Sequence, residues 1–159
     1  MLLSDLSLEL IQLTKNISEE KNPVFSPDNN KIAFTRDNDL YVIDLVTLTE
    51  IRLTHDGSEW IYNGWASWVY YEEILGRSSH YRAFWWSPDS KMIAFLRSDD
   101  SPVPVFPLFI ADGIHGDLES AHYPKPGHPN PLVKLWVIHI NSARVILLDD
   151  TEKDDHYIA

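Results

Sequence analysis

Hydrophobic and polar residues alternate in several short segments of the chain, which is the pattern of β-strands that bury one face. Two of these segments, residues 25–34 (FSPDNNKIAF) and 86–95 (WSPDSKMIAF), repeat one pattern with the same spacing. In each copy an aromatic residue ends a strand, Ser-Pro-Asp forms a turn in which proline fixes the backbone, and an apolar run begins the next strand. The sequence therefore predicts two copies of one antiparallel arrangement.

Further strands follow each copy of this repeat. Residues 39–44 (DLYVID) and 50–54 (EIRLT) complete a four-stranded unit over residues 22–54. A second unit occupies residues 83–148, and its strands are predicted at residues 83–87, 92–97, 132–140 and 144–148. Units of four antiparallel strands that recur about every 40 residues are typical of β-propeller blades.

The first residues of the chain resemble the end of the first unit. Residues 11–14 (IQLT) match residues 51–54 (IRLT) at an offset of 40 residues, so we interpret residues 1–14 as the last strand of a preceding blade. Two blades and one strand cannot close a ring, because propellers need about four to eight blades. The predicted fold class is all-β, a part of a β-propeller in which residues 149–159 lead toward a further unit. A self-contained β-sandwich is the alternative.

A long insertion, residues 98–131, separates the second and third strands of the second predicted unit. It holds seven of the ten prolines of the chain: Pro102, Pro104, Pro107, Pro124, Pro126, Pro129 and Pro131. Loops of such length are uncommon in compact domains and usually have a function. Because dense proline makes a segment semi-rigid, we expect an arm here. A simple covering loop is the alternative.

The linker between the two units, residues 55–82, contains two adjacent carboxylates among aromatic and aliphatic residues. An Asn-Gly turn signal precedes them, and Gly76 lies where a helical turn would stop. We therefore predict a short helical insert over residues 67–75 that carries Glu72 and Glu73. On a helical turn both side chains can reach one ligand, whereas on a strand they would point to opposite faces. Carboxylates in apolar surroundings need a cation; solvated surface charges are the alternative.

Composition and charge narrow the function classes. The chain has 159 residues, of which 44% are hydrophobic, enough for a folded domain with a core. Its formal net charge of −11 repels nucleic acids and anionic membranes and favours a cationic partner. Without cysteine the chain has no disulfide, thiolate nucleophile or thiolate zinc site. We also expect neither a membrane anchor nor an export signal in this chain.

The sequence offers no motif for catalysis by this chain alone. A Gly-x-Ser-x-Gly nucleophile elbow is absent, and the seven histidines show no His-Glu-x-x-His spacing. The six glycines are scattered and form no phosphate-binding loop. We therefore expect no metal site, no cofactor and no hydrolysis by the chain itself.

The chain resembles the propeller domain of the dipeptidyl peptidase IV family over nearly its whole length. The resemblance depends on the order and spacing of these runs: residues 61–64 (IYNG), 68–73 (WVYYEE), 85–89 (WWSPD), 101–104 (SPVP), 123–127 (YPKPG) and 130–131 (NP). The family pattern reads Asp-Trp-Val-Tyr-Glu-Glu-Glu, and here Ser67 and Tyr71 stand at its first Asp and first Glu. The last two glutamates of the pattern fall on Glu72 and Glu73.

This resemblance implies a function for the helical insert. In the family, a separate α/β-hydrolase domain carries the catalytic Ser, Asp and His, and the propeller glutamates hold the free amino terminus of the substrate. Glu72 and Glu73 would then bind a peptide ammonium, and Trp68, Tyr70 and Tyr71 would support their helix. The parent protein would be a serine exopeptidase that releases Xaa-Pro or Xaa-Ala dipeptides.

The resemblance also implies partners and a location. The expected partners are peptide amino termini, the rest of the parent chain with its hydrolase domain, and a second copy through the arm at residues 98–131, but not nucleic acid. The implied location is the cell envelope, the periplasm or the extracellular space. Two alternatives stay open: a non-catalytic β-propeller module that binds proteins or peptides, and a related tripeptidyl exopeptidase.

Overall fold

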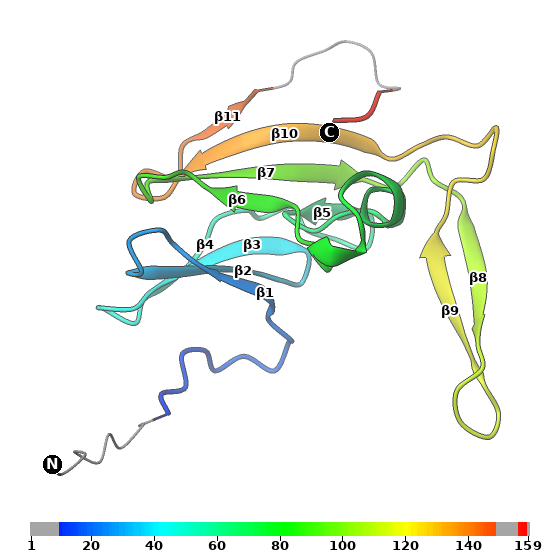
Figure 1. Ribbon diagram of the computed structural model, residues 1–159, viewed down its shortest axis with the longest axis horizontal. Coiled ribbons are helices and arrows are strands. Elements are labelled where there is room, and N and C mark those ends of the chain that lie inside the picture. The colour runs from blue at the N-terminus through cyan, green and yellow to red at the C-terminus, as the bar shows by residue number, and fades with distance from the viewer. Residues whose placement is uncertain (1–9, 149–155, 159) are drawn as a thin grey trace, which may run out of the picture.

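The computed structural model describes residues 10–148 and 156–158. Figure 1 shows two antiparallel sheets that lie face to face and a two-stranded hairpin that projects away from them. We refer to these sheets as the first blade and the second blade. Among the described residues, no helix has the length and apolar character needed to cross a membrane.

Four strands form the first blade in chain order: β1 (Lys21–Phe25), β2 (Lys31–Arg36), β3 (Asp39–Asp44) and β4 (Glu50–Arg52). Nearly every position of β2 and β3 is buried, so these strands are covered on both faces. Ala33 and Val42 face the second blade, whereas Phe34 and Tyr41 belong to a separate cluster on the opposite face. The first blade is thus built to lie between two neighbours.

Five strands form the second blade: β5 (Ile61–Asn63), β6 (Phe84–Trp86), β7 (Met92–Asp99), β10 (Leu132–His139) and β11 (Val145–Leu147). β11 pairs with β10 and β10 with β7, and the other edge of β7 is shared by β5 and β6. Residues 64–83 leave the sheet between these two short strands; we call them the insert. The interpretation of residues 55–82 as a linker is therefore wrong at β5, which pairs within the second blade.

The repeated Ser-Pro-Asp turns have the same hydrogen bonds in both blades. In the first, Ser26 Oγ donates to Asp28 Oδ1 (2.6 Å) and accepts from the N–H of Lys31 (2.9 Å). Ser87 makes the same two bonds at the same distances, to Asp89 Oδ1 and to the N–H five residues on. The hydrogen bond from Ser26, followed by that from the N–H of Asn30, lowers the pKa of Asp28 to about 2. The predicted repeat is confirmed as two copies of one turn.

The insert contains a π-helical turn, η1 (Tyr70–Ile74), and a 3-10 turn, η2 (Arg77–Ser79). The predicted short helix is thereby confirmed. Gly76 ends it with a φ of 77°, in the left-handed region that glycine adopts without strain.

The predicted arm is a β-hairpin. Within residues 98–131, β8 (Val105–Ile110) and β9 (Asp117–His122) pair in antiparallel fashion along their whole length. Figure 1 shows this hairpin extending away from both blades. The sequence did not predict its strands, because the dense prolines argue against a sheet. Pro107 is tolerated within β8 because each strand of a two-stranded hairpin has a free edge, where a missing N–H costs nothing.

Apolar clusters join the blades to each other and to the insert. The cluster between the blades consists of Ala33, Leu40, Val42, Leu53, Phe84, Ile93, Phe95, Ile138 and Ile140. On the far face of the second blade, residues of the insert such as Ala66 and Tyr70 pack against Leu96 of β7 and Val133 of β10. The insert is therefore a packed part of the second blade.

The prediction of a blade strand at residues 11–14 is wrong, because residues 10–20 contain no strand. A strand needs a neighbour for its backbone hydrogen bonds, and no strand that the structure describes pairs with these residues. Leu13 packs instead on the outer face of the first blade. The rest of that prediction, residues 1–9, lies outside the described residues, as does most of the predicted tail at residues 149–159.

Candidate functional site

The insert leaves and re-enters the second blade through a narrow neck. The N–H of Gly64 donates to Leu96 O (2.9 Å), and the N–H of Ala83 donates to Gly64 O (2.9 Å). Further along, the N–H of Ala66 donates to Tyr81 O (2.8 Å). Gly64 has a φ of 73°, and a Cβ there would lie 3.3 Å from two core side chains, so glycine fits where others would not. The neck fixes both ends of the segment that carries the carboxylates.

A wide helical turn presents the two carboxylates. The N–H of Leu75 donates to Tyr70 O at 2.7 Å, a bond across five residues that makes the turn π-helical. At the start of the same turn, the N–H of Tyr71 donates to Ser67 O at 3.0 Å, a bond across four residues as in an α-helix. Single π-helical turns are frequent at functional sites. This one contains both glutamates of the predicted site.

The two glutamates differ in their partners. The side chain of Glu72 is 14% exposed, and its Oε2 accepts a hydrogen bond from Arg77 Nε at 2.6 Å. Glu73 is exposed and makes no hydrogen bond or ion pair with any residue that the structure describes. Because the Arg77 side chain is 75% exposed, its pairing with Glu72 is weak and open to competition by another cation. The insert thus presents one partly neutralised carboxylate beside one unpaired carboxylate.

The three predicted supporting residues pack against other parts of the chain. Tyr70 is buried, and its hydroxyl accepts a hydrogen bond of 2.9 Å from a backbone N–H near the C-terminus. Tyr71 stacks on Tyr81, with ring centres 3.7 Å apart. Trp68 meets Tyr123 of the arm, with ring centres 4.4 Å apart. Together these contacts hold the helical turn between the second blade and the arm.

Sequence reasoning missed a group of stacked side chains beside the carboxylates. Tyr81 stacks both on Tyr71 and on Trp65, whose ring is parallel to it within 2° at 4.8 Å. Lys21 Nζ lies 4.9 Å from the centre of the Trp65 ring. Burial, followed by the nearby Tyr71 and Glu72, raises the pKa of Tyr81. The one sequence signal for this pairing is that Trp65 and Tyr81 lie near opposite ends of the insert.

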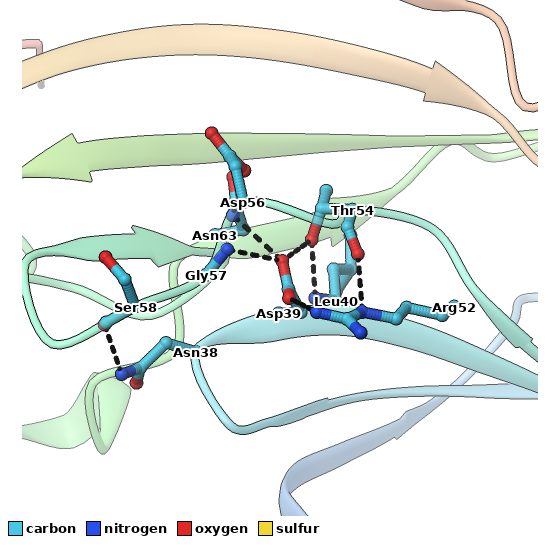
Figure 2. A network of polar contacts seen from close by, with 9 residues as sticks. All are labelled: Asn38, Asp39, Leu40, Arg52, Thr54, Asp56, Gly57, Ser58 and Asn63. Atoms are coloured by element: carbon cyan, nitrogen blue, oxygen red, sulfur yellow. Dashed lines mark hydrogen bonds and ion pairs between the residues drawn. The ribbon is translucent and has the colours of Figure 1, made fainter.

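A buried polar network lies next to the neck, where the two blades meet (Figure 2). Asp39, at the start of β3, is fully buried, and its Oδ2 pairs with Arg52 of β4. Its Oδ1 accepts hydrogen bonds from Thr54 Oγ1 (2.5 Å), from the N–H of Gly57 (3.1 Å) and from Asn63 Nδ2 (3.1 Å). Both oxygens have partners, which is the condition for burying a carboxylate.

This network continues into the second blade. Asn63 Nδ2 also donates to Asp56 Oδ1 (2.8 Å), and Arg97 Nε of β7 donates to Asp56 Oδ2 (2.8 Å). Burial acts to raise the pKa of Asp56, but these two hydrogen bonds outweigh it and lower the pKa below its usual value. Because Asn63 directly precedes Gly64, the network fixes the strand from which the insert begins.

The chemistry available on the insert is that of charge and hydrogen bonding. Within residues 10–148 and 156–158, no group of three or more His, Asp or Glu side chains is arranged to hold a metal ion. The two glutamates offer carboxylate oxygens to a ligand with several N–H donors, and the surrounding aromatic rings offer flat apolar surface.

Comparisons with known proteins agree on one family. A family model of the dipeptidyl peptidase IV (DPP IV) N-terminal region matches residues 2–159. Dipeptidyl aminopeptidase B of Saccharomyces cerevisiae is 40% identical over 119 residues, which cover 72% of this chain and 14% of that protein. The probable dipeptidyl-aminopeptidase B of Talaromyces stipitatus is 38% identical over 133 residues, which cover 76% of this chain and 14% of that protein.

Solved structures share the fold. The crystal structure of Porphyromonas gingivalis dipeptidyl peptidase 4 matches with a TM-score of 0.80 and 30% identity, and the match covers 92% of this chain and 20% of that chain. A putative dipeptidyl aminopeptidase IV from Bacteroides ovatus matches with a TM-score of 0.66 and 25% identity. The predicted propeller-blade fold is confirmed. The chain spans only 14% of the length of the two curated relatives named above.

Proposed function

Because the chain belongs to the family of dipeptidyl peptidase IV N-terminal regions, we propose that it selects substrates for a serine exopeptidase of this type. In this proposal Glu72 and Glu73 bind the free N-terminal ammonium of a peptide. The parent enzyme then releases Xaa-Pro or Xaa-Ala dipeptides, with a catalytic Ser, Asp and His that lie elsewhere in the parent chain.

The observation that carries this proposal is the exposed carboxylate of Glu73, which has no partner among the described residues, beside the weakly paired Glu72. An α-ammonium has three N–H donors, and two carboxylates offer more acceptors than it needs. Charge-assisted hydrogen bonds of this kind contribute about 1.5 to 3 kcal/mol each. The site can therefore distinguish a free amine from a blocked one.

Binding the amine in this way also sets the position of cleavage. An ammonium held by the insert places the peptide at a fixed distance from the nucleophile, so only one bond along the chain reaches it. A peptide with a blocked amine would leave both carboxylates without a partner and would bind poorly. The rigid neck and the packed tyrosines support this function, because a loose insert could not fix that distance.

Changing Glu73 to glutamine in the full-length enzyme tests the proposal. We expect Glu73→Gln to lower kcat/KM by more than tenfold for a free-amine dipeptide substrate, because the amide carries no charge to hold the ammonium. Glu19→Gln, the same change at another exposed glutamate, is the matched control and should leave kcat/KM unchanged. Kinetics of Glu73→Gln close to those of the unchanged enzyme would refute the role.

The two alternative functions would give different products from a free-amine peptide. A non-catalytic propeller module would bind peptides without any turnover by the full-length protein. A tripeptidyl exopeptidase would release tripeptides from the same substrates. Mass spectrometry of the products from one free-amine peptide therefore separates all three functions.

A second proposal concerns the arm, whose hairpin carries exposed apolar side chains. Phe109 is 69% exposed and Leu118, its partner across the hairpin, is 67% exposed. Val105, Ile110 and Ile114 are also exposed. Large apolar side chains exposed on one short hairpin are typical of a contact with another protein, and the hairpin also has free strand edges. We propose that a second copy of the parent protein covers this surface in a homodimer.

Sedimentation of the full-length protein tests the dimer. We expect the protein to sediment as a dimer, and Phe109→Asp together with Leu118→Asp to convert it to a monomer without loss of fold. A dimer that survives both substitutions would contradict the proposal, as would a monomeric unchanged protein.

A further inference from the structure

A cavity of about 480 Å³ lies between the insert and the root of the arm. We call it the aromatic cavity. Its lining combines aromatic rings of the insert with carboxylates from neighbouring segments: Trp65, Trp68, Tyr81, Glu59, Asp100 and Glu119. Among the described residues, no lysine or arginine lines it. Its volume lies in the range of cavities that bind small molecules or side chains.

The aromatic wall suits a cation. Trp65 and Tyr81 form a parallel stack, and Lys21 Nζ already lies 4.9 Å from the centre of the Trp65 ring. This ring therefore attracts a cation of the chain itself. Aromatic faces bind cations through their negative quadrupole, and Trp binds them best. A guanidinium group is planar and weakly hydrated, so it stacks on such rings more readily than an ammonium does.

Asp100 supplies a buried acceptor in the same cavity. Its side chain is 1% exposed, and its Oδ1 accepts a hydrogen bond from Ser98 Oγ at 2.6 Å. No residue that the structure describes donates a hydrogen bond to its Oδ2. This oxygen is open to a donor, and a guanidinium N–H would form a charge-assisted hydrogen bond with it. Glu119 is exposed and adds a second negative charge.

The aromatic cavity borders the carboxylate pair without containing it. Tyr81 lines the cavity and stacks on Tyr71, which directly precedes Glu72. Glu72 and Glu119 both act electrostatically on the Tyr81 hydroxyl and contribute to raising its pKa, after burial and Tyr71. A ligand in the cavity is therefore close to Glu72 but makes its contacts with other residues.

We propose that the aromatic cavity binds the guanidinium group of an arginine side chain. The ring of Trp68 provides the stacking face, Trp65 and Tyr81, which are stacked on each other, complete the aromatic wall, and Asp100 and Glu119 accept the N–H groups. The arginine belongs either to a substrate peptide or to another protein chain, and the chemistry of recognition is the same. The inference that the arginine comes from a substrate peptide rests on the proposed function, whereas an arginine of another protein chain does not require it.

Titration of the full-length protein with N-acetyl-arginine amide tests this site, because its blocked amine cannot engage Glu72 and Glu73. N-acetyl-citrulline amide, which has the same shape without the charge, is the control ligand. We expect calorimetry to show at least tenfold tighter binding of the arginine compound. Equal affinities, or no binding of either compound, would overturn the inference.

Variants locate the bound arginine. Glu119→Gln should weaken binding of N-acetyl-arginine amide at least threefold, whereas Asp112→Asn on the same arm, outside the cavity lining, should not change it. Glu73→Gln should also leave this affinity unchanged. Loss of binding in Glu73→Gln would place the compound at the carboxylate pair and overturn the inference while leaving the proposed function intact. Unchanged binding in Glu119→Gln would overturn it as well.

Substrate kinetics distinguish the two sources of the arginine. Free-amine peptides that differ only by arginine or citrulline at one position are compared in the full-length enzyme. A higher kcat/KM for the arginine peptide that disappears in Glu119→Gln assigns the cavity to substrate recognition. Equal kcat/KM values, with N-acetyl-arginine amide still bound, assign it to an arginine of another protein chain.

Discussion

Asp39 and Glu73 carry the same functional group in opposite surroundings. Asp39 is fully buried where the blades meet, and Arg52, Thr54 and Asn63 are among the partners of its two oxygens (Figure 2). Glu73 is exposed on the insert and has no hydrogen-bond or ion-pair partner among the described residues. A carboxylate whose oxygens all accept hydrogen bonds from the chain can be buried and can fix backbone positions. A carboxylate whose oxygens accept none is available to a ligand. Burial and partners therefore separate the residue that builds the fold from the residue that can bind.

The two regions are nevertheless connected. Asn63 donates to Asp39, and Gly64, the next residue, begins the neck of the insert. The position of Glu72 and Glu73 relative to the blades thus depends on a polar network at the base of the insert. The network gives the binding residues a rigid base.

The largest expected effect is at Asp39. Asp39→Asn should lower the free energy of unfolding by about 3 kcal/mol or more, because several buried donors of the network, among them Thr54 and Asn63, lose a charged acceptor at about 1 to 3 kcal/mol each. Urea unfolding of the full-length protein, followed by tryptophan fluorescence, measures this. The same change at Glu73 should alter the free energy of unfolding by less than about 0.5 kcal/mol. Equal losses in the two variants would remove the distinction between them.

Asp100 is an intermediate case, because it is a buried carboxylate in which one oxygen accepts a hydrogen bond from the described residues and the other does not. Burial raises its pKa from 3.8 to about 6. Between these pH values the folded state binds more protons than the unfolded state, so the stability contributed by this group falls as the pH rises. The full shift corresponds to about 3 kcal/mol.

Asp100→Asn isolates this contribution, because asparagine keeps an acceptor for Ser98 but does not titrate. The two proteins should have similar free energies of unfolding near pH 4. By about pH 7 the variant should be the more stable one, by up to about 3 kcal/mol. Urea unfolding at a series of pH values measures the difference, and parallel pH profiles for the two proteins would show that Asp100 does not titrate in this way.

The smallest expected effect is at Arg77. Its pair with Glu72 is exposed on the arginine side, and such pairs contribute at most about 1 kcal/mol. Arg77→Gln frees Glu72 Oε2 for a ligand, so KM for a free-amine substrate should fall by less than about threefold with little change in stability. Steady-state kinetics measure this. A large rise in KM would show instead that Arg77 helps to hold the substrate.

Local patterns in the sequence predicted the parts of the fold that local chemistry determines. The Ser-Pro-Asp turns and the helix that ends at Gly76 are of this kind. β5 was missed because three residues carry little pattern, and its partner in β7 is distant in the chain. The strand predicted at residues 11–14 is wrong because its pattern fits a strand but no strand among the described residues pairs with it. Strand pairing is a property of the whole fold, which a local pattern does not contain.

The residues of the candidate site also fall into those that the sequence revealed and those that only the fold revealed. Glu72 and Glu73 stand out in the sequence as adjacent carboxylates among aromatic residues. Arg77 does not, because no local pattern shows that its side chain turns back to Glu72, five residues earlier. Trp65 and Tyr81 do not either, because they stack only after the neck brings the two ends of the insert together. Sequence therefore located the charged groups, and the fold supplied their surroundings.

The most direct measurement is a crystal structure of the full-length enzyme with a bound free-amine peptide inhibitor. We expect the ammonium nitrogen to lie within about 3 Å of a carboxylate oxygen of Glu72 and of Glu73. An ammonium bound away from both carboxylates, with the insert facing only solvent, would contradict the proposed function.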